Sequence, residues 1–147
     1  MQLTSSAFTN GGAIPSQYTC DGAGQSPPLS WTGVPSGTAS LALRVQDIDT
    51  PTQFIHWLIY DIPSSTTSLA AGQVPAGAKQ ATNSFNKVGY GGPCPPAGSK
   101  HRYVFTMLAL GTRLTVSESV PASELWSPLE RSAVVGQGQL TGTYQRS

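Results

Sequence analysis

Two histidines and a pair of closely spaced aspartates are the side chains with the clearest capacity for chemistry in this sequence. Asp47 and Asp49 lie in the segment Asp-Ile-Asp-Thr-Pro that ends at Pro51, and His56 and His101 are the only histidines. A histidine can donate or accept a proton near neutral pH, and a carboxylate can orient a histidine or accept a hydrogen bond from a ligand. These side chains are therefore the first candidates for a binding or acid–base site.

Each of these residues also has a structural interpretation. Asp47 and Asp49 precede a proline, so both can be turn formers whose carboxylates accept bonds from backbone N–H groups. His56 lies in the otherwise apolar stretch 54–60, where a histidine is more often a hydrogen-bonded core residue than a catalyst. His101 differs, because it directly follows a loop that a ligand can approach.

That loop, residues 89–98, reads Gly-Tyr-Gly-Gly-Pro-Cys-Pro-Pro-Ala-Gly. Glycines allow a ligand to approach the backbone closely, and prolines keep such a loop stiff. Its backbone N–H groups can form an anion-binding nest. The loop lacks the glycine and lysine spacing of a nucleotide-binding loop, and the alternative interpretation is a rigid surface loop.

The two cysteines, Cys20 and Cys94, each lie in a loop rich in Gly and Pro. They are too far apart in sequence for a Cys-x-x-Cys redox or zinc motif. The sequence alone allows either a loop-to-loop disulfide or two thiols beside a pocket, and free thiols are favoured for a cytosolic protein.

The elements that must position these residues are mainly strands. Only 10% of the residues are charged, while Gly and Pro number 16 and 12, a balance typical of short strands joined by turns. Strands are predicted at 41–45, 54–61, 101–110 and 137–144, with an irregular stretch at 63–97. Segment 54–61 is apolar on both faces and is expected near the centre of a sheet. In the strand at 101–110, a period of two places His101, Tyr103, Phe105 and Met107 on one face.

One helix is predicted near the C-terminus. Ser127 is expected as its N-cap, Pro128 as its first residue and Glu130 as its third, with the helix continuing through Val135. A weaker helical turn is predicted to begin near Ala122. Helix is therefore expected mainly within residues 122–135.

Length and charge limit the classes of function. The chain has 147 residues, the usual size of one domain, and shows no repeat or linker, so a single domain over 1–147 is expected. The net charge is +1 and the eight basic residues are scattered, which disfavours nucleic-acid binding. No apolar stretch is long enough to span a bilayer. A cytoplasmic protein is expected, or a periplasmic or secreted one if a leader was removed and replaced by an initiating Met.

Several catalytic and metal-binding motifs are missing from the sequence. It contains no Gly-x-Ser-x-Gly and no His-Glu-x-x-His, and its histidines and aspartates show no compact ligand spacing. No metal and no cofactor are therefore expected.

In combination and order, the motifs resemble the bacterial and archaeal branch of the phosphatidylethanolamine-binding protein family, often described as Raf kinase inhibitor-like. The resemblance runs almost end to end and rests on segments 14–15, 18–22, 26–31, 47–51, 56–57, 89–96, 101–103 and 142–144. Segment 47–51 is similar to the family's Asp-Pro-Asp-x-Pro motif. The resemblance implies an all-β fold with a large antiparallel sheet, a smaller second sheet packed against it, and short peripheral helices.

The resemblance also implies a pocket for phosphate-like or carboxylate anions at one edge of the fold. The residues expected to bind the ligand are Asp47, Pro51, His56, Gly92, Pro93, Cys94, Pro95, His101 and Tyr103. Asp49 and Arg102 are expected to be structural. The resemblance further brings the loops of Cys20 and Cys94 together, which implies that these two residues are close enough to form a disulfide.

Three positions depart from the family pattern. Ile48 stands where the motif usually has Pro, which loosens the turn that aims Asp47. Ser84 stands where the branch commonly has Asp, and Ala133 where a His is common. None of the three removes an expected pocket residue.

The leading interpretation is a binding module for a small anionic ligand or phospholipid head group that modulates a kinase or protease partner, with a homodimer as a further option. This part of the interpretation is inherited from the family and is associational. The alternative is a biosynthetic enzyme, a lyase or isomerase, that uses Asp47, His56 and His101 as catalytic residues for acid–base chemistry such as dehydration. The sequence offers no nucleophile with an activating base, unless Cys94 is a free thiolate.

Overall fold

A computed structural model describes residues 1–114, 116 and 120–147 of the chain. The strands are β1 (Gln2–Thr4), β2 (Leu29–Thr32), β3 (Ser40–Asp47), β4 (Phe54–Pro63), β5 (Ser68–Leu69), β6 (Lys79–Gln80), β7 (Lys100–Leu110) and β8 (Val134–Gln145). The helical elements are the short 3-10 helix η1 (Ser16–Tyr18) and the α-helix α1 (Ala122–Glu130). None of the described helices is long and apolar enough to span a membrane.

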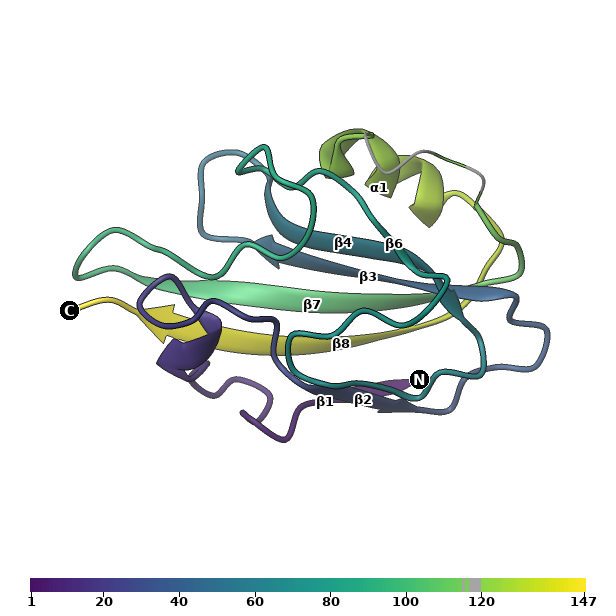
Figure 1. Cartoon of the computed structure of the whole chain (residues 1–147), viewed down its shortest axis with the longest axis horizontal. Helices are drawn as coiled ribbons and strands as arrows, with labels where there is room; N and C mark the ends of the chain where they lie inside the picture. The colour runs from purple at the N-terminus through teal and green to yellow at the C-terminus, as the bar shows by residue number, and fades with distance from the viewer. Residues whose placement is uncertain (115, 117–119) are drawn as a thin grey trace.

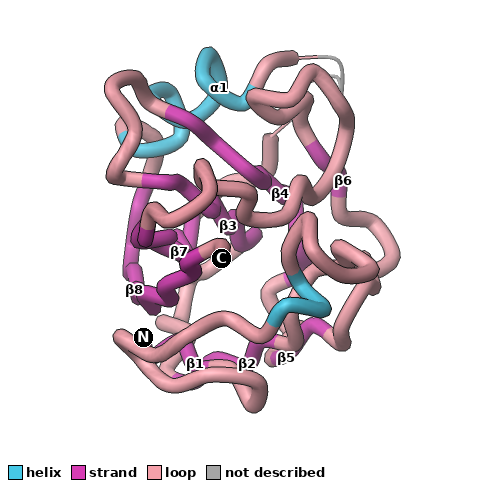
Figure 2. The backbone as a smooth tube through the Cα atoms, turned by 90° about the vertical axis from the view of Figure 1, so that its left-hand side faces the viewer, coloured by secondary structure: helices cyan, strands magenta, loops and turns pink. Residues whose placement is uncertain are grey.

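The strands form two antiparallel sheets. The larger has the order β6-β4-β3-β7-β8 and the smaller has the order β1-β2-β5. Figure 1 shows the long strands β3, β7 and β8 running side by side, and Figure 2 shows the small sheet and α1 on opposite sides of the large sheet. The predicted all-β class, with a second smaller sheet, is confirmed.

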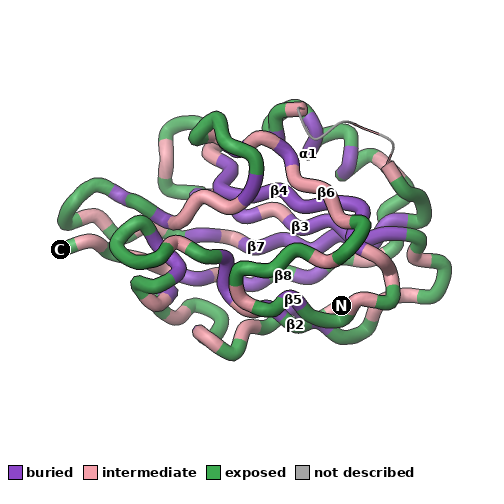
Figure 3. The backbone as a smooth tube through the Cα atoms, viewed as in Figure 1, coloured by how far each residue is buried: buried purple, intermediate pink, exposed green. Residues whose placement is uncertain are grey.

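The core has two parts because both faces of the large sheet are covered. Alternate residues of the central strands, including Leu43, Trp57 and Phe105, form one cluster with Leu3 and Trp31 of the small sheet. The residues between them face the opposite way and pack against α1. The buried residues of this second cluster are Ala42, Ile55, Leu58, Tyr60, Ala81, Leu108, Leu110, Ala122, Leu125, Trp126 and Leu129. Burial is concentrated along the strands of the large sheet (Figure 3). This two-sided burial explains why segment 54–61 is apolar on both faces.

The four predicted strands are confirmed, and each is longer than expected. Segment 101–110 lies in β7 and segment 54–61 in β4, and β3 separates the two in the sheet. The stretch expected to be irregular contains two short strands, β5 and β6, each of two residues.

The predicted start of the helix at Ser127 is wrong, and α1 begins at Ala122. Ala122, Leu125, Trp126 and Leu129 have the i, i+3, i+4, i+7 spacing of an apolar helical stripe, and all four are buried. Pro128 therefore lies inside the helix rather than at its first position. Burial of this stripe against the sheet decides the boundaries, and it outweighs the local Ser-Pro signal.

The predicted continuation of the helix through Val135 is also wrong. The helix ends at Glu130, and β8 begins at Val134. β8 pairs with β7 over almost its whole length, from Leu110↔Val134 to Lys100↔Gln145. Pairing with β7 thus places Val134 and Val135 in the sheet rather than in the helix.

Candidate functional site

The candidate site lies at the end of the large sheet where β3 ends and β4 and β7 begin, at the left in Figure 1. Because these neighbouring strands are antiparallel, the register brings Asp47 of β3 opposite Phe54 of β4 and Tyr103 of β7. A cavity of about 220 Å³ opens at this point. We call it the histidine pocket, and its lining residues are Asp47, Thr50, Phe54, His56, Phe85, Cys94, Pro95, Pro96 and His101.

Asp47 joins the turn after β3 to the histidine at the start of β7. Its Oδ2 accepts a hydrogen bond from Nδ1 of His101 at 2.5 Å, and its Oδ1 accepts one from the backbone N–H of Asp49 at 2.9 Å. The carboxylate is buried, with 4% of the residue exposed. Both carboxylate oxygens are therefore engaged, and Asp47 fixes the orientation of His101.

His56 is held by the glycine-rich loop. Its Nδ1 donates to the carbonyl oxygen of Gly91 at 2.7 Å, and the Gly91 N–H donates to the carbonyl oxygen of His56 at 2.8 Å. Because a carbonyl only accepts, the proton of the neutral ring lies on Nδ1. Burial lowers the pKa of His56, an effect that the carbonyl group of Gly91 opposes.

Tyr103 lies beneath the two histidines rather than on the wall of the pocket. Its ring makes an edge contact with His56, with ring centroids 5.2 Å apart. The hydroxyl group is buried and makes no hydrogen bond of good geometry with any described residue. Burial first, and then the negative charge of Asp47, raise the pKa of Tyr103 above its ordinary value, so the hydroxyl keeps its proton.

Asp49 and Arg102 fasten the turn after β3 to the start of β7. Asp49 Oδ2 accepts from the Arg102 backbone N–H at 2.7 Å and from its side-chain Nε at 3.1 Å, while Oδ1 accepts from its Nη2 at 2.7 Å. Hydrogen bonding to Arg102 lowers the pKa of Asp49 to about 2. Ile48 adds a further bond, because its N–H donates to the Arg102 carbonyl at 3.1 Å, which a proline at this position cannot do.

The loop that closes the pocket is tied to the N-terminal part of the chain. Cys20 and Cys94 form a disulfide, with Cα atoms 5.4 Å apart, and the Cys20 N–H donates to the Pro93 carbonyl at 3.1 Å. A Cβ atom on Gly92 would lie 2.9 Å from the backbone of Thr19, so only glycine allows the two segments to approach this closely.

The structure brings five of the nine predicted ligand-binding residues to the histidine pocket, and these are Asp47, His56, Cys94, Pro95 and His101. Gly92 lines a neighbouring cavity instead. Pro51 is exposed in the turn after β3 and lines neither cavity, and Pro93 and Tyr103 are buried behind the walls.

Three lining residues were not predicted, namely Thr50, Phe54 and Phe85, whereas Pro96 belongs to the loop that was expected at the pocket. Phe85 covers one side of the pocket, with its ring centroid 4.9 Å from Phe54 and 5.3 Å from His56. The sequence signal that could have indicated Phe85 is a large aromatic residue within a turn rich in Asn and Ser. The segment reaches β4 because the Ile55 N–H donates to Oγ of Ser84 at 2.9 Å.

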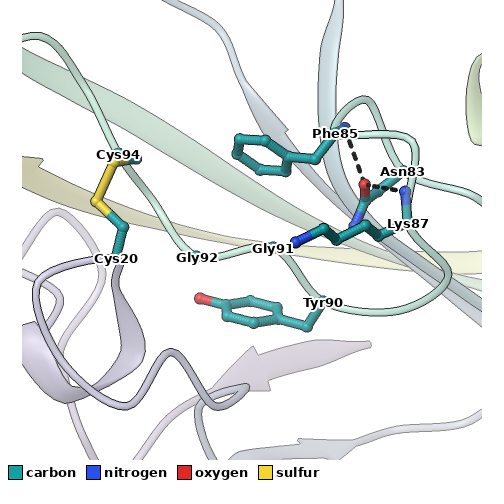
Figure 4. A pocket seen from close by; sticks show the side chains of 8 residues that line it. All are labelled: Cys20, Asn83, Phe85, Lys87, Tyr90, Gly91, Gly92 and Cys94. Atoms are coloured by element: carbon teal, nitrogen blue, oxygen red, sulfur yellow. Dashed lines mark hydrogen bonds between the residues drawn. A yellow bond between two sulfur atoms is a disulfide. The ribbon is translucent and has the colours of Figure 1, made fainter.

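A second cavity, of about 480 Å³, adjoins the histidine pocket and shares Phe85 and Cys94 with it (Figure 4). Its lining residues are Cys20, Asn83, Phe85, Lys87, Tyr90, Gly91, Gly92 and Cys94. The backbone of Gly91, which holds His56, thus forms a wall of the second cavity.

Within the part of the chain that the structure describes, no three His, Cys, Asp or Glu side chains gather closely enough to hold a metal ion. The polar groups of the histidine pocket are instead paired one by one with protein partners. The pocket is therefore arranged as a small, partly apolar cavity with two oriented imidazoles.

Comparison with known proteins places this geometry in a family. The family model described as phosphatidylethanolamine-binding protein matches residues 4–145. A UPF0098 protein of Methanothermobacter thermautotrophicus is 43% identical over 152 residues, covering 99% of both chains. The putative lipoprotein LppC of Mycobacterium tuberculosis is 37% identical, covering 99% of this chain and 72% of the relative.

Solved structures give the same result for the fold. The crystal structure of E. coli YbcL, described as a member of the mammalian PEBP family, superposes with a TM-score of 0.92 at 32% identity and covers 99% of this chain and 98% of YbcL. A carboxypeptidase Y inhibitor, solved in complex with its cognate proteinase, superposes with a TM-score of 0.60 at 17% identity, covering 99% and 82% of the two chains. The second likeness concerns the fold alone.

Proposed function

The chain belongs to the phosphatidylethanolamine-binding protein family, and we propose that it is a binding protein whose histidine pocket receives a small anionic group such as a phosphate or carboxylate. The observation that carries the proposal is the convergence of His56 and His101 on one cavity while Asp47 is held by His101 and by a backbone N–H. The carboxylate is thus occupied, and the imidazoles face the ligand.

The ring nitrogens support a defined role for each histidine. Both His56 and His101 use Nδ1 for their bond to the protein, so Nε2 is the nitrogen left for a ligand. A protonated Nε2 donates a charge-assisted hydrogen bond to an anion. Because Asp47 already holds the Nδ1 side of His101, a ligand meets an imidazole whose orientation is fixed in advance.

A backbone donor adds to this arrangement. In the described part of the chain, the N–H group of Cys94, which lines the histidine pocket, donates to no other residue. Free amides in a turn rich in glycine and proline can hold an anion. At about 220 Å³, the pocket is sized for the anionic group of a ligand rather than for a whole lipid.

Calorimetric titration with inorganic phosphate tests the proposal. Replacing His101 with Ala should weaken phosphate binding about tenfold or more, the value of one charge-assisted hydrogen bond. Arg113→Ala is a matched control, because this exposed cation follows the far end of β7 and lines neither cavity. Equal phosphate affinity in the parent protein and His101→Ala would exclude the histidine pocket as the binding site.

A second candidate function is acid–base catalysis, which the hydrogen bond between Asp47 and His101 favours. A carboxylate that orients an imidazole is a common arrangement for proton transfer. Nucleophilic catalysis by Cys94 loses its basis, because both cysteines of the chain are in the disulfide. Turnover of an anionic substrate that is lost in Asp47→Asn while phosphate binding persists would support the enzyme.

Partner and location belong to the same proposal. A protease partner is supported by the shared fold with the carboxypeptidase Y inhibitor, which was solved in complex with its proteinase. A location outside the cytoplasm is supported by the disulfide and by the relative named as a lipoprotein. Thiol labelling of the protein in its native cells tests the location, since labelling without reductant would argue for the cytoplasm.

A further inference from the structure

The second cavity adjoins the histidine pocket closely enough to receive the remainder of one ligand. Phe85 and Cys94 line both cavities, so a molecule whose anionic group lies beside His101 can continue past these two residues. With about 480 Å³, the second cavity is the larger of the two and can hold a group the size of an aromatic ring or a short acyl chain.

The walls of the second cavity are mainly apolar. In Figure 4 the rings of Phe85 and Tyr90 flank the backbone of Gly91 and Gly92, and the disulfide closes one end. Phe85 is 39% exposed, so its ring still has apolar surface whose burial against a ligand would be favourable. The Tyr90 hydroxyl is already used, because it donates to the Tyr18 carbonyl at 2.7 Å. The ring surfaces therefore remain as the contacts offered to a ligand.

The charges of the second cavity favour an anionic occupant over a cationic one. The Asn83 Oδ1 accepts from the N–H groups of Phe85 and Lys87, and its Nδ2 donates one hydrogen bond to the Gly89 carbonyl. Lys87 has no ion-pair partner among the described residues, and the described lining contains no carboxylate. The cavity thus presents one ammonium group and apolar surface, which suits a ligand that is negatively charged overall.

Glycine residues hold the two cavities in this relation. A Cβ atom on Gly91 would lie 2.4 Å from the ring of Phe85, so glycine allows that ring to stand between the cavities. The same residue binds His56 through its carbonyl. Gly91 therefore both orients the imidazole of His56 and lines the second cavity.

We propose that the ligand has two parts, an anionic group in the histidine pocket and an apolar body that packs against Phe85 and Tyr90 in the second cavity. This inference rests on the proposed function, because it takes the anionic group to be bound by the two histidines. It names the ligand class as organic phosphates or carboxylic acids with an aromatic or short acyl body, in place of a free inorganic anion.

Calorimetric titration with inorganic phosphate and with phenyl phosphate tests the inference. The parent protein should bind phenyl phosphate about tenfold more tightly, the gain expected when roughly half of a phenyl ring leaves water. In Phe85→Ala this preference should fall to about threefold or less. Val88→Ala is the matched control, because this exposed residue has an apolar side chain but lines neither cavity, and it should keep the full preference.

Amide chemical shifts of the unmodified protein give a readout that needs no variant. Phenyl phosphate should shift the amide signals of Lys87 and Tyr90, which line only the second cavity, and inorganic phosphate should leave them unchanged. If both anions bind equally and neither shifts these signals, the two-part ligand is excluded while the histidine pocket stands. If neither anion binds the parent protein, the proposed function itself fails.

Discussion

Removal of the disulfide should destabilise the protein by about 4 kcal/mol. Cys20 and Cys94 are 74 residues apart in sequence, and the chain-entropy relation for a loop of this length gives about 4 kcal/mol at 25 °C. For a domain of this size, that loss corresponds to a fall in Tm of roughly 8–16 °C. The bond also ties the loop of Pro95 to the rest of the fold, so phosphate affinity should fall together with stability.

Urea unfolding, followed by fluorescence of the three tryptophans, measures this change. The oxidised parent protein is compared with the reduced parent protein and with a double variant, Cys20→Ser with Cys94→Ser. Both cysteines are exposed, so a dithiol reductant can reach the bond. The double variant is the control for the reductant, which should not affect it. A loss below about 1 kcal/mol would refute the reasoning that the cross-link constrains the unfolded chain.

Three further changes have defined outcomes. Gly91→Ala should displace the Phe85 ring, which lines the pocket, and lower the free energy of unfolding by about 1–3 kcal/mol, as measured by urea unfolding. Unchanged stability and unchanged phosphate affinity in this variant would contradict the close contact between Gly91 and Phe85. Because burial lowers the pKa of His56, the unfolded state takes up more protons below about pH 6.5, so stability should fall as the pH drops from 7.5 to 5.5. That contribution should vanish in His56→Gln, and an identical pH slope in the two proteins would show that burial does not hold His56 neutral. Asp49→Asn should cost no more than about 1 kcal/mol at pH 7, because the ion pair with Arg102 is largely at the surface, and the cost should disappear as the pH falls through about 2; a cost that is independent of pH would contradict this.

The strands could be predicted because their signal is local. In β7, alternating residues such as Tyr103 and Phe105 face one core cluster while Leu108 and Leu110 face the other, and this alternation is visible in the sequence. The start of α1 could not be predicted from its caps, because the burial of Leu125 and Trp126 against the sheet decides it.

The candidate site was predicted in part for a similar reason. Asp47 and His101 follow from motifs that lie at strand ends, although they are 54 residues apart and their hydrogen bond exists only in the folded sheet. Phe85 was missed because its segment reaches the pocket through long-range bonds between Ser84 and Ile55, which no local pattern indicates. The second cavity was missed with it, since Phe85 forms the wall between the two.

The central claim is that His56 and His101 bind an anion through Nε2 while the protein holds Nδ1. The most direct test is to record the nitrogen NMR signals of the histidine rings during a titration with inorganic phosphate. We expect saturable shifts of the Nε2 signals of both histidines, smaller changes at Nδ1, and tighter binding as the pH falls, because a protonated imidazole supplies both charge and a second donor. Phosphate binding that leaves both Nε2 signals unchanged, or no binding at any pH at which the protein is folded, would contradict the claim.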